Sequence, residues 1–395
     1  MTPLITSKQR MTLLIVAVFG HGLKHMFNAA FFVLLPEIKA GLNLSNTQIG
    51  TLSTFRAIIS GFANIPAGFM GDQYPKQRAI ILGGSIILVS VFAVALGLAK
   101  GFWTAVVFSS LLSVAITFCH PAAISSLAKE FTSRRGFAIA LHGTGGSIGE
   151  TLGPIIAGSL IGVIGWRLVL QGSIIPGLFC GILIWILLRN IPVQASENTT
   201  VVQYISSVTN LLRKRKLIFV LIFAAGFSGA QSTVLTFLPI YLDEDKGFQS
   251  VTIGLYLSLA QVGGIISQPI MGYVSDRLGR KVVLVPSMII LGLSFLGIPI
   301  AADGLLFGLV VLVMGAFTFP LMALFLASAM DLVDTGTQAT TVSLVFGAAI
   351  VVSAFAPAVA GIIADNINTE AAFLFASALA LSTAVFTLST NWQSR

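Results

Sequence analysis

The sequence predicts an all-α membrane protein, with twelve transmembrane helices in two pseudo-symmetric six-helix bundles around a central cavity. Three observations support this fold class. Of the 395 residues, 56% are hydrophobic and 9% are charged, whereas a soluble domain carries about 25% charged residues. The apolar residues gather into twelve long runs, and the two halves of the chain share a spacing pattern. Because so apolar a chain cannot cover itself with a polar surface, we exclude a soluble enzyme and a nucleic-acid-binding protein.

A helix that crosses the hydrocarbon core of a bilayer needs about 20 mostly apolar residues. Such runs predict spans over residues 11–36, 46–70, 79–99, 102–127, 136–162, 167–189, 217–241, 249–272, 282–301, 305–329, 336–364 and 371–391. The first run is too long for the core of a signal peptide and lacks a small-residue cleavage site, so we count it as a span. One long polar interval divides the chain. We therefore expect an N-terminal bundle over 1–189, a cytoplasmic linker over 190–216 and a C-terminal bundle over 217–395.

The positions of Lys and Arg predict the orientation, because cytoplasmic loops carry an excess of both. With the N-terminus in the cytoplasm, most of the 22 Lys and Arg residues fall on the cytoplasmic side. The exceptions are Lys24 and Arg56, inside spans, and the outer residues Lys39, Lys100, Arg167 and Lys246. We therefore expect an inner-membrane protein with both termini in the cytoplasm. This distribution also explains the net charge of +8 without a nucleic-acid partner.

An internal repeat relates the two halves. The matched elements, in chain order, are Leu35-Pro36 and Leu238-Pro239, Ile49-Gly50 and Ile253-Gly254, Pro66 and Pro269, Gly68-x-x-x-Asp72 and Gly272-x-x-x-Asp276, Pro121 and Pro320, and Gly153-Pro154 and Ala356-Pro357. Matches in the same order along both halves indicate a duplication. Two parallel six-span repeats imply two bundles that rock about a central site near the middle of the membrane.

Two copies of one loop carry the most specific resemblance. Residues 68–78 read Gly-Phe-Met-Gly-Asp-Gln-Tyr-Pro-Lys-Gln-Arg, and residues 272–281 read Gly-Tyr-Val-Ser-Asp-Arg-Leu-Gly-Arg-Lys. Both resemble the loop between spans two and three of the major facilitator superfamily, and the resemblance to that family covers nearly the whole chain. Gly lets helices approach closely, and an Asp near a helix end can pair with Arg. The resemblance implies a conformational switch made by Gly68, Asp72, Arg78, Gly272, Asp276 and Arg280.

Span five carries a second motif, Gly149-x-x-x-Gly153-Pro154-x-x-Ala157-Gly158. It resembles the motif that marks antiporters, which are exporters, within the superfamily, although it departs from that motif at Ala157 and at Ala140. Small residues with a Pro predict a kinked, tightly packed helix. The resemblance implies efflux rather than import, and it adds Gly149, Gly153 and Pro154 to the switch.

Span four lacks the Arg that many proton-coupled drug exporters carry there. It holds instead the stretch Phe118-Cys119-His120-Pro121-Ala122-Ala123, and Arg135-Gly136 follows. This stretch resembles the fosmidomycin-resistance branch of the superfamily. That resemblance implies drug resistance and phosphonate substrates.

Polar and ionisable residues inside a membrane are costly and usually functional. Here His21, Lys24, His25 and Asn28 share one helix face in span one. A face this polar would be unfavourable against lipid, and we therefore expect it to line the cavity. The alternative is that these side chains snorkel toward the start of the helix. We predict that substrate is bound by His21, Lys24, His25, Asn28, Arg56, His120, Gln231 and Gln261. For the two Gln residues, helix packing is an equal alternative.

Glu150 is the one carboxylate that we place deep in a span, and His142 lies about two turns before it on the same side of the helix. The protonation of a buried carboxylate depends on burial and on nearby cations, and His titrates near neutrality. We therefore predict proton coupling by Glu150 and His142. The alternatives for Glu150 are a structural ion pair with Arg56 or Lys24 and a direct contact with substrate.

The cations inside the membrane outnumber this one carboxylate, which favours an anionic or zwitterionic substrate. We expect a secondary active transporter that works by alternating access, as a proton-coupled exporter of a small organic anion or polar antimicrobial compound. Proton-coupled uptake of an organic anion and a metal-ion transporter lined by His are the alternatives. The sequence holds no G-x-x-x-x-G-K-[ST] motif and no recognised zinc spacing. We expect no enzyme activity, metal or cofactor, and a monomer whose partners are its substrate, protons and the lipid bilayer.

Overall fold

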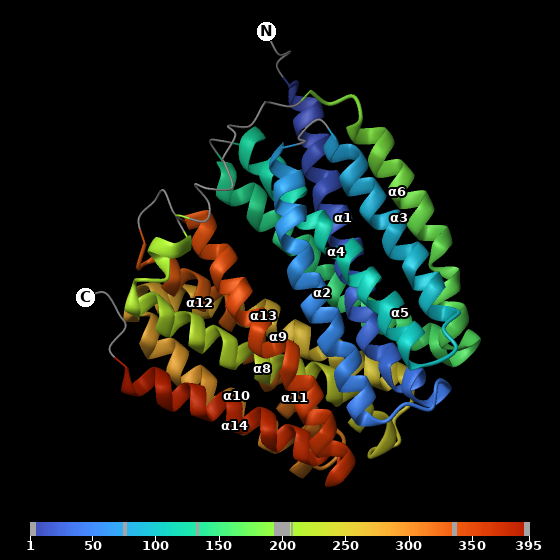
Figure 1. Cartoon of the computed structure of the whole chain (residues 1–395), viewed down its shortest axis with the longest axis vertical. Coiled ribbons are helices and arrows are strands. Elements are labelled where there is room, and N and C mark those ends of the chain that lie inside the picture. The colour runs from blue at the N-terminus through green and yellow to red at the C-terminus, as the bar shows by residue number, and fades with distance from the viewer. Residues whose placement is uncertain are drawn as a thin grey trace. The chain divides into compact units, whose positions relative to one another are not determined.

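The computed structural model describes residues 5–73, 77–131, 134–192, 206, 208–333 and 338–390. In these ranges the regular elements are all helices (Figure 1). The first half holds α1 (Ser7–Gly41), α2 (Asn46–Gln73), α3 (Arg78–Gly97), α4 (Phe102–Glu130), α5 (Arg135–Gly172) and α6 (Ile174–Leu188). The second half holds α8 (Arg215–Glu244), α9 (Ser250–Leu278), α10 (Arg280–Ile300), α11 (Leu305–Thr318), α12 (Leu321–Met330), α13 (Gln338–Asn366) and α14 (Glu370–Ser389).

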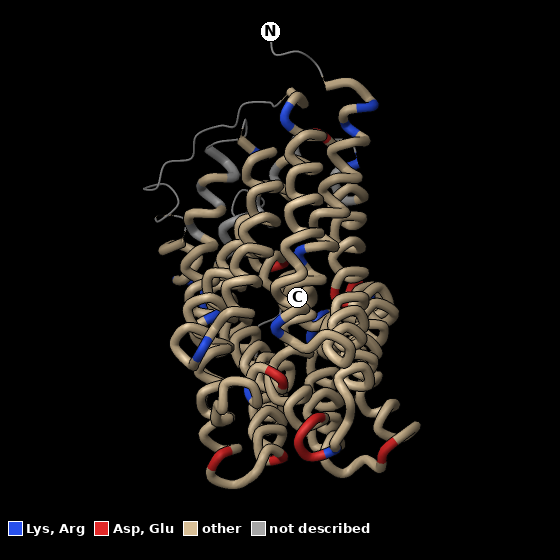
Figure 2. The backbone as a smooth tube through the Cα atoms, turned by 90° about the vertical axis from the view of Figure 1, so that its right-hand side faces the viewer, with Lys and Arg blue, Asp and Glu red and all other residues tan. Residues whose placement is uncertain are grey.

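These helices are suited to a bilayer. Within the described part of the chain, 10 segments are long and apolar enough to cross a membrane. One of them, Phe137–Leu188, is 52 residues long and contains both α5 and α6. With α2 added, the helices follow the twelve predicted spans in order. Large apolar side chains such as Val163 and Leu305 are about four-fifths exposed, at 80% and 82%, and charged residues are sparse along the helices (Figure 2).

Local sequence explains where several helices begin and break. Thr6 and Gln9 form a capping box, in which each side chain accepts the other residue's backbone N–H, and α1 begins there. Within α5, Gly165 adopts φ 75° and ψ 157°, and the helix kinks at this residue. This break falls between the predicted spans 136–162 and 167–189. The predicted span 305–329 is divided into α11 and α12 at Pro320, which has no N–H to donate to the preceding turn.

The chain divides into two compact units. Unit 1 comprises Met1–Asn43, Phe55–Asn198 and Gln249–Leu255, and unit 2 comprises Leu44–Thr54, Thr199–Phe248 and Tyr256–Arg395. Unit 1 therefore holds most of the first six spans and unit 2 most of the last six. The start of α2 belongs to unit 2, and the start of α9 belongs to unit 1. The predicted linker over 190–216 lies mostly outside the described residues.

Candidate functional site

Four ionisable side chains, those of His21, His25, His142 and Glu150, lie where α1 crosses α5. Glycines four residues apart on α5 form a stripe that lies against the α1 backbone. A β-carbon on Gly145, Gly149 or Gly153 would collide with the carbonyl oxygen of Val18, Gly22 or Met26, respectively. The tight packing predicted for this motif is confirmed, and its partner in unit 1 is α1. Because the two backbones touch, side chains on either flank of the contact are brought within hydrogen-bonding distance.

Three histidines and one carboxylate form a hydrogen-bonded chain across this contact. Nδ1 of His25 lies 2.6 Å from Oε1 of Glu150, and Nε2 of His25 lies 3.1 Å from Nε2 of His21. Nδ1 of His21 donates to the carbonyl oxygen of His142 (2.7 Å), and Nδ1 of His142 donates to that of Ala17 (3.1 Å). The rings of His21 and His142 are stacked, with centroids 3.8 Å apart.

These bonds fix the number of protons shared by His21, His25 and Glu150. A carbonyl oxygen only accepts, so Nδ1 of His21 carries a proton. If His21 is neutral, its Nε2 accepts and Nε2 of His25 must donate. Nδ1 of His25 then either carries a second proton or accepts one from a protonated Glu150. If Nε2 of His25 accepts instead, His21 carries both protons. In every case these three side chains hold one proton more than two neutral histidines and an ionised Glu150 would supply.

The partner of Glu150 was not predicted. The sequence suggested Arg56 or Lys24 as its ion-pair partner, whereas the structure pairs it with His25 at 2.6 Å. Packing of α1 against the glycine stripe explains this choice, because it places His25 directly opposite Glu150. His142 and Glu150 both contact α1, so they share one side of α5, as their spacing predicted.

Lys24 lies on α1 beside this chain. Its side chain is buried, within electrostatic reach of Glu150 on α5 and of the Cys119 thiol on α4. It makes no hydrogen bond to a described residue. Asn28, one turn further along α1, is half-buried.

Arg56 on α2 occupies an aromatic environment. Its guanidinium carbon lies 3.4 Å from the centroid of the Phe31 ring and 6.0 Å from that of Phe32. The residue is 7% exposed, and its Nε has no hydrogen-bond partner among the described atoms. Ser113 of α4 donates to its backbone carbonyl at 3.1 Å. Cation–π contact accounts for the position of this arginine, while its charge lacks a carboxylate partner in the described chain.

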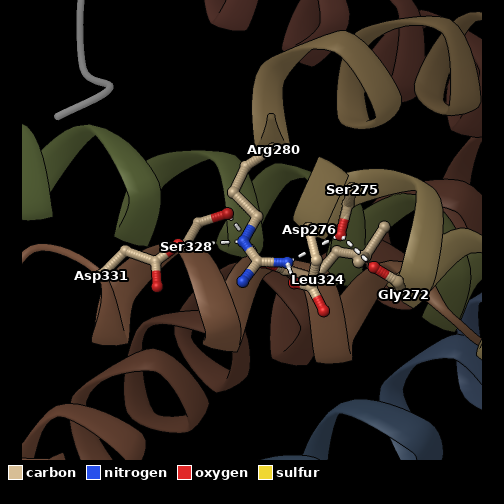
Figure 3. Close-up of polar contacts among 7 residues, drawn as sticks. All are labelled: Gly272, Ser275, Asp276, Arg280, Leu324, Ser328 and Asp331. Atoms are coloured by element: carbon tan, nitrogen blue, oxygen red, sulfur yellow. Dashed lines mark hydrogen bonds and ion pairs between the residues drawn. The ribbon is translucent and has the colours of Figure 1, made fainter. Parts of the chain in front are cut away.

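The second switch loop forms a compact ion-pair cluster (Figure 3). Arg280, at the start of α10, donates through Nε to Asp331 (2.9 Å) and through Nη1 to Ser275 (2.7 Å) and Asp276. The pair of Asp276 and Arg280 agrees with the expectation from sequence, and Asp331, which is 47% exposed, adds a second carboxylate to it. A β-carbon on Gly272 would meet no described atom within 4 Å. The role of this glycine in the switch stays a prediction.

Arg78, from the first copy of the loop, has a different role from Arg280. Its Nη2 donates to the carbonyl oxygens of Ile191 (3.3 Å) and Pro192 (3.2 Å), and its Nη1 lies 4.0 Å from Glu130. Lys281 makes the matching contacts in the second half, to the carbonyl oxygens of Leu388 and Thr390 at the end of α14. Arg78 thus makes contacts like those of Lys281, and it joins the start of α3 to the residues that follow α6.

The other predicted residues are placed as follows. Gly68 and Asp72 lie on α2 and His120 lies on α4, but the surroundings of their side chains fall outside the described part of the structure. Gln231 on α8 and Gln261 on α9 are half-buried in unit 2.

Two equivalent glycine contacts join helices near one end of each unit. In unit 1, a β-carbon on Gly254 of α9 would collide with the carbonyl oxygen of Pro154. In unit 2, a β-carbon on Gly50 of α2 would collide with that of Pro357. Asp365 reinforces the second contact, since its carboxylate accepts from the backbone N–H groups at the start of α2. Both contacts join positions that the sequence repeat matches.

A model described as the Major Facilitator Superfamily matches residues 17–341 and 229–392. This chain belongs to the Major Facilitator Superfamily. One relative, the fosmidomycin resistance protein of Escherichia coli, is 23% identical over 374 residues, 92% of this chain and 88% of that protein. The cis,cis-muconate transport protein of Acinetobacter baylyi is 24% identical over 257 residues, 62% of each chain. The crystal structure of a bacterial homologue of the human lysosomal transporter Spinster has a TM-score of 0.78 and 16% identity, and covers 97% of this chain and 95% of that one.

Membership of the Major Facilitator Superfamily confirms the predicted fold class. The chain is a multi-pass membrane transporter of a small molecule, not an enzyme. Its relatives include drug-resistance and organic-anion transporters.

Proposed function

We propose that this chain exports a small organic anion, or a polar antimicrobial compound of similar charge, by proton-coupled alternating access. The proposal places it in the inner membrane with both termini in the cytoplasm, as the Lys and Arg distribution predicts. It also takes the chain to act as a monomer, since the whole ionisable cluster lies within unit 1.

Proton coupling is supported by the number of protons that His21, His25 and Glu150 share. With one extra proton the three groups are neutral in sum and every hydrogen bond between them is made. Loss of that proton breaks at least one of these bonds, either the His21–His25 bond within α1 or a bond that joins α1 to α5. In the second case proton release is linked to the packing of two helices, which is what a coupled transporter requires. His142 acts here as a positioning residue, because its carbonyl oxygen fixes the His21 tautomer.

The charge of the substrate follows from the remaining cations. Because the charges of His21, His25 and Glu150 sum to zero when the extra proton is present, Glu150 does not offset the charge of Lys24. Arg56 has no carboxylate partner in the described residues. A buried cation without a counterion is costly, and an anionic substrate would supply the missing charge.

The direction of transport rests on the α5 motif and on the relatives. The motif that contains Gly149, Gly153 and Pro154 resembles the antiporter motif, and one relative is named for fosmidomycin resistance. Uptake of an organic anion by proton symport is the second candidate, favoured by the relative named as a muconate transport protein.

Reconstitution into liposomes that contain a pH-sensitive dye tests this function. A gradient of a transported organic anion should drive protons in the opposite direction for export and in the same direction for symport. Glu150→Gln should abolish the dye signal in both cases. Anion flux with no proton movement in the native protein would refute coupling, and transport of cations alone would refute the substrate class.

A further inference from the structure

We infer that the substrate carries two separate anionic groups, so that its class is a short linear dicarboxylate. One carboxylate would pair with Lys24 and the other with Arg56. This inference rests on the proposed transport of organic anions and narrows it. It follows from three features of α1 and α2: two buried cations, the absence of a hydrogen-bonded carboxylate for either among the described residues, and the position of Arg56 on the ring of Phe31.

Arg56 is built as a rigid anion receptor. Stacking on Phe31 at 3.4 Å fixes the plane of its guanidinium group and excludes water from one side of it. Its Nε is buried and has no partner among the described atoms. A planar guanidinium group binds carboxylates through two parallel hydrogen bonds, and this geometry favours a carboxylate over a compact halide ion. The side chain is closed to solvent here, so binding follows an opening of the site.

Lys24 supplies a second, separate positive charge. It is 2% exposed and makes no hydrogen bond to a described residue. The groups that act on it are Glu150 from α5, the thiol of Cys119 from α4, and the neighbouring histidines. Glu150 is already engaged with His25 at 2.6 Å. An anion arriving beside Lys24 would therefore meet a net positive site.

The helix period places the two cations at different heights along α1. Lys24 and Phe31 are seven residues apart and lie on the same face of α1, which separates their α-carbons by about 10 Å. The guanidinium carbon of Arg56 lies 3.4 Å from the centroid of the Phe31 ring, so this charge lies beside α1 at the level of Phe31. Two carboxylates that each make a charge-assisted contact of about 2.8 Å then need a short hydrocarbon chain between them. Asn28 lies between Lys24 and Phe31 on that face, where its amide can bind a carboxylate oxygen.

Binding of matched acids to the purified transporter in detergent tests this inference. The probes are adipate, with two carboxylates, hexanoate, with one on a chain of the same length, and hexane-1,6-diamine as the cation control. We expect adipate to bind at least tenfold more tightly than hexanoate, and the diamine not to bind, because each charge-assisted contact contributes about tenfold or more. Lys24→Gln and Arg56→Gln should each reduce adipate affinity to that of hexanoate. Lys8→Gln, an exposed lysine of the same helix, is the matched control and should change neither.

Several outcomes would overturn the inference. Equal affinity for adipate and hexanoate would do so while leaving proton-coupled anion export intact. Failure of every anion to bind would overturn both this inference and the proposed substrate class. If a neutral variant does not fold, Lys24→Arg keeps the charge and lengthens the side chain, so it should keep the preference for two carboxylates and favour a shorter diacid. Loss of that preference in a folded Lys24→Arg protein would count against the inference.

Discussion

The carbonyl oxygen of Pro154 lies directly against Gly254, in the space that a β-carbon would need. The repeat produces the same relationship a second time, between Pro357 and Gly50. Two backbones can come this close only where one residue has no side chain. The duplication thus preserved a backbone contact as well as a sequence pattern.

Gly254→Ala and Gly50→Ala are expected to disfavour this conformation, because the added methyl group must push a carbonyl oxygen away. Overpacking of this kind costs about 1–3 kcal/mol. The apparent melting temperature in detergent should fall, and the transport rate should change. Gly162→Ala is the matched control, since nothing lies within 4 Å of a β-carbon there. Equal melting temperatures for all three variants would contradict the contact.

The crossing of α1 and α5 makes a second prediction. Gly149→Ala should separate α1 from α5 at Gly22 and so weaken the His25–Glu150 contact. Both stability and proton coupling should decrease. Gly143→Ala, on the same helix with open space around its β-carbon, should leave both unchanged. A Gly149→Ala transporter with native coupling would show that close packing is not what positions Glu150.

Glu150→Gln should uncouple transport from the pH gradient while counterflow exchange survives. A Gln amide can donate a hydrogen bond to Nδ1 of His25, so it reproduces the protonated state but cannot release a proton. The melting temperature should therefore stay close to that of the native protein. If counterflow is lost together with stability, Glu150 is a structural partner of His25 and carries no proton.

The Arg280 cluster governs rate rather than binding in our proposal. Asp276→Asn and Asp331→Asn should each slow transport and leave substrate affinity unchanged, because both carboxylates contact only Arg280 among the ion pairs described for unit 2. Both are about half exposed or more, at 64% and 47%, so each pair should stabilise the fold by only about 0–1 kcal/mol. Asp72→Asn should act in the same way in the first half. Initial rates and equilibrium binding, measured on the same preparation, separate the two effects, and reduced binding at a normal rate would refute this role.

Features that depend on local composition and spacing could be predicted from the amino-acid sequence. Apolar runs predicted the helices, and the kink at Gly165 falls between two predicted spans. The pair of Asp276 and Arg280 is also local, since the two residues are four apart. The glycine stripe of α5 predicted a close contact with another helix, but it did not indicate which helix that would be. Each of these features could be predicted because a helix period or a bilayer thickness fixes it without reference to distant residues.

Which distant groups meet could not be predicted and became visible in the three-dimensional structure. An ion pair with Arg56 or Lys24 was one alternative for Glu150, and the structure pairs it with His25. The structure also shows that Arg56 stacks on Phe31 and that Asp331 pairs with Arg280. The physical reason is that a charged side chain in a membrane pairs with whatever the neighbouring backbone brings within a few ångströms. Which backbones touch depends on small residues on both helices at once, and a pattern along one helix does not contain that information.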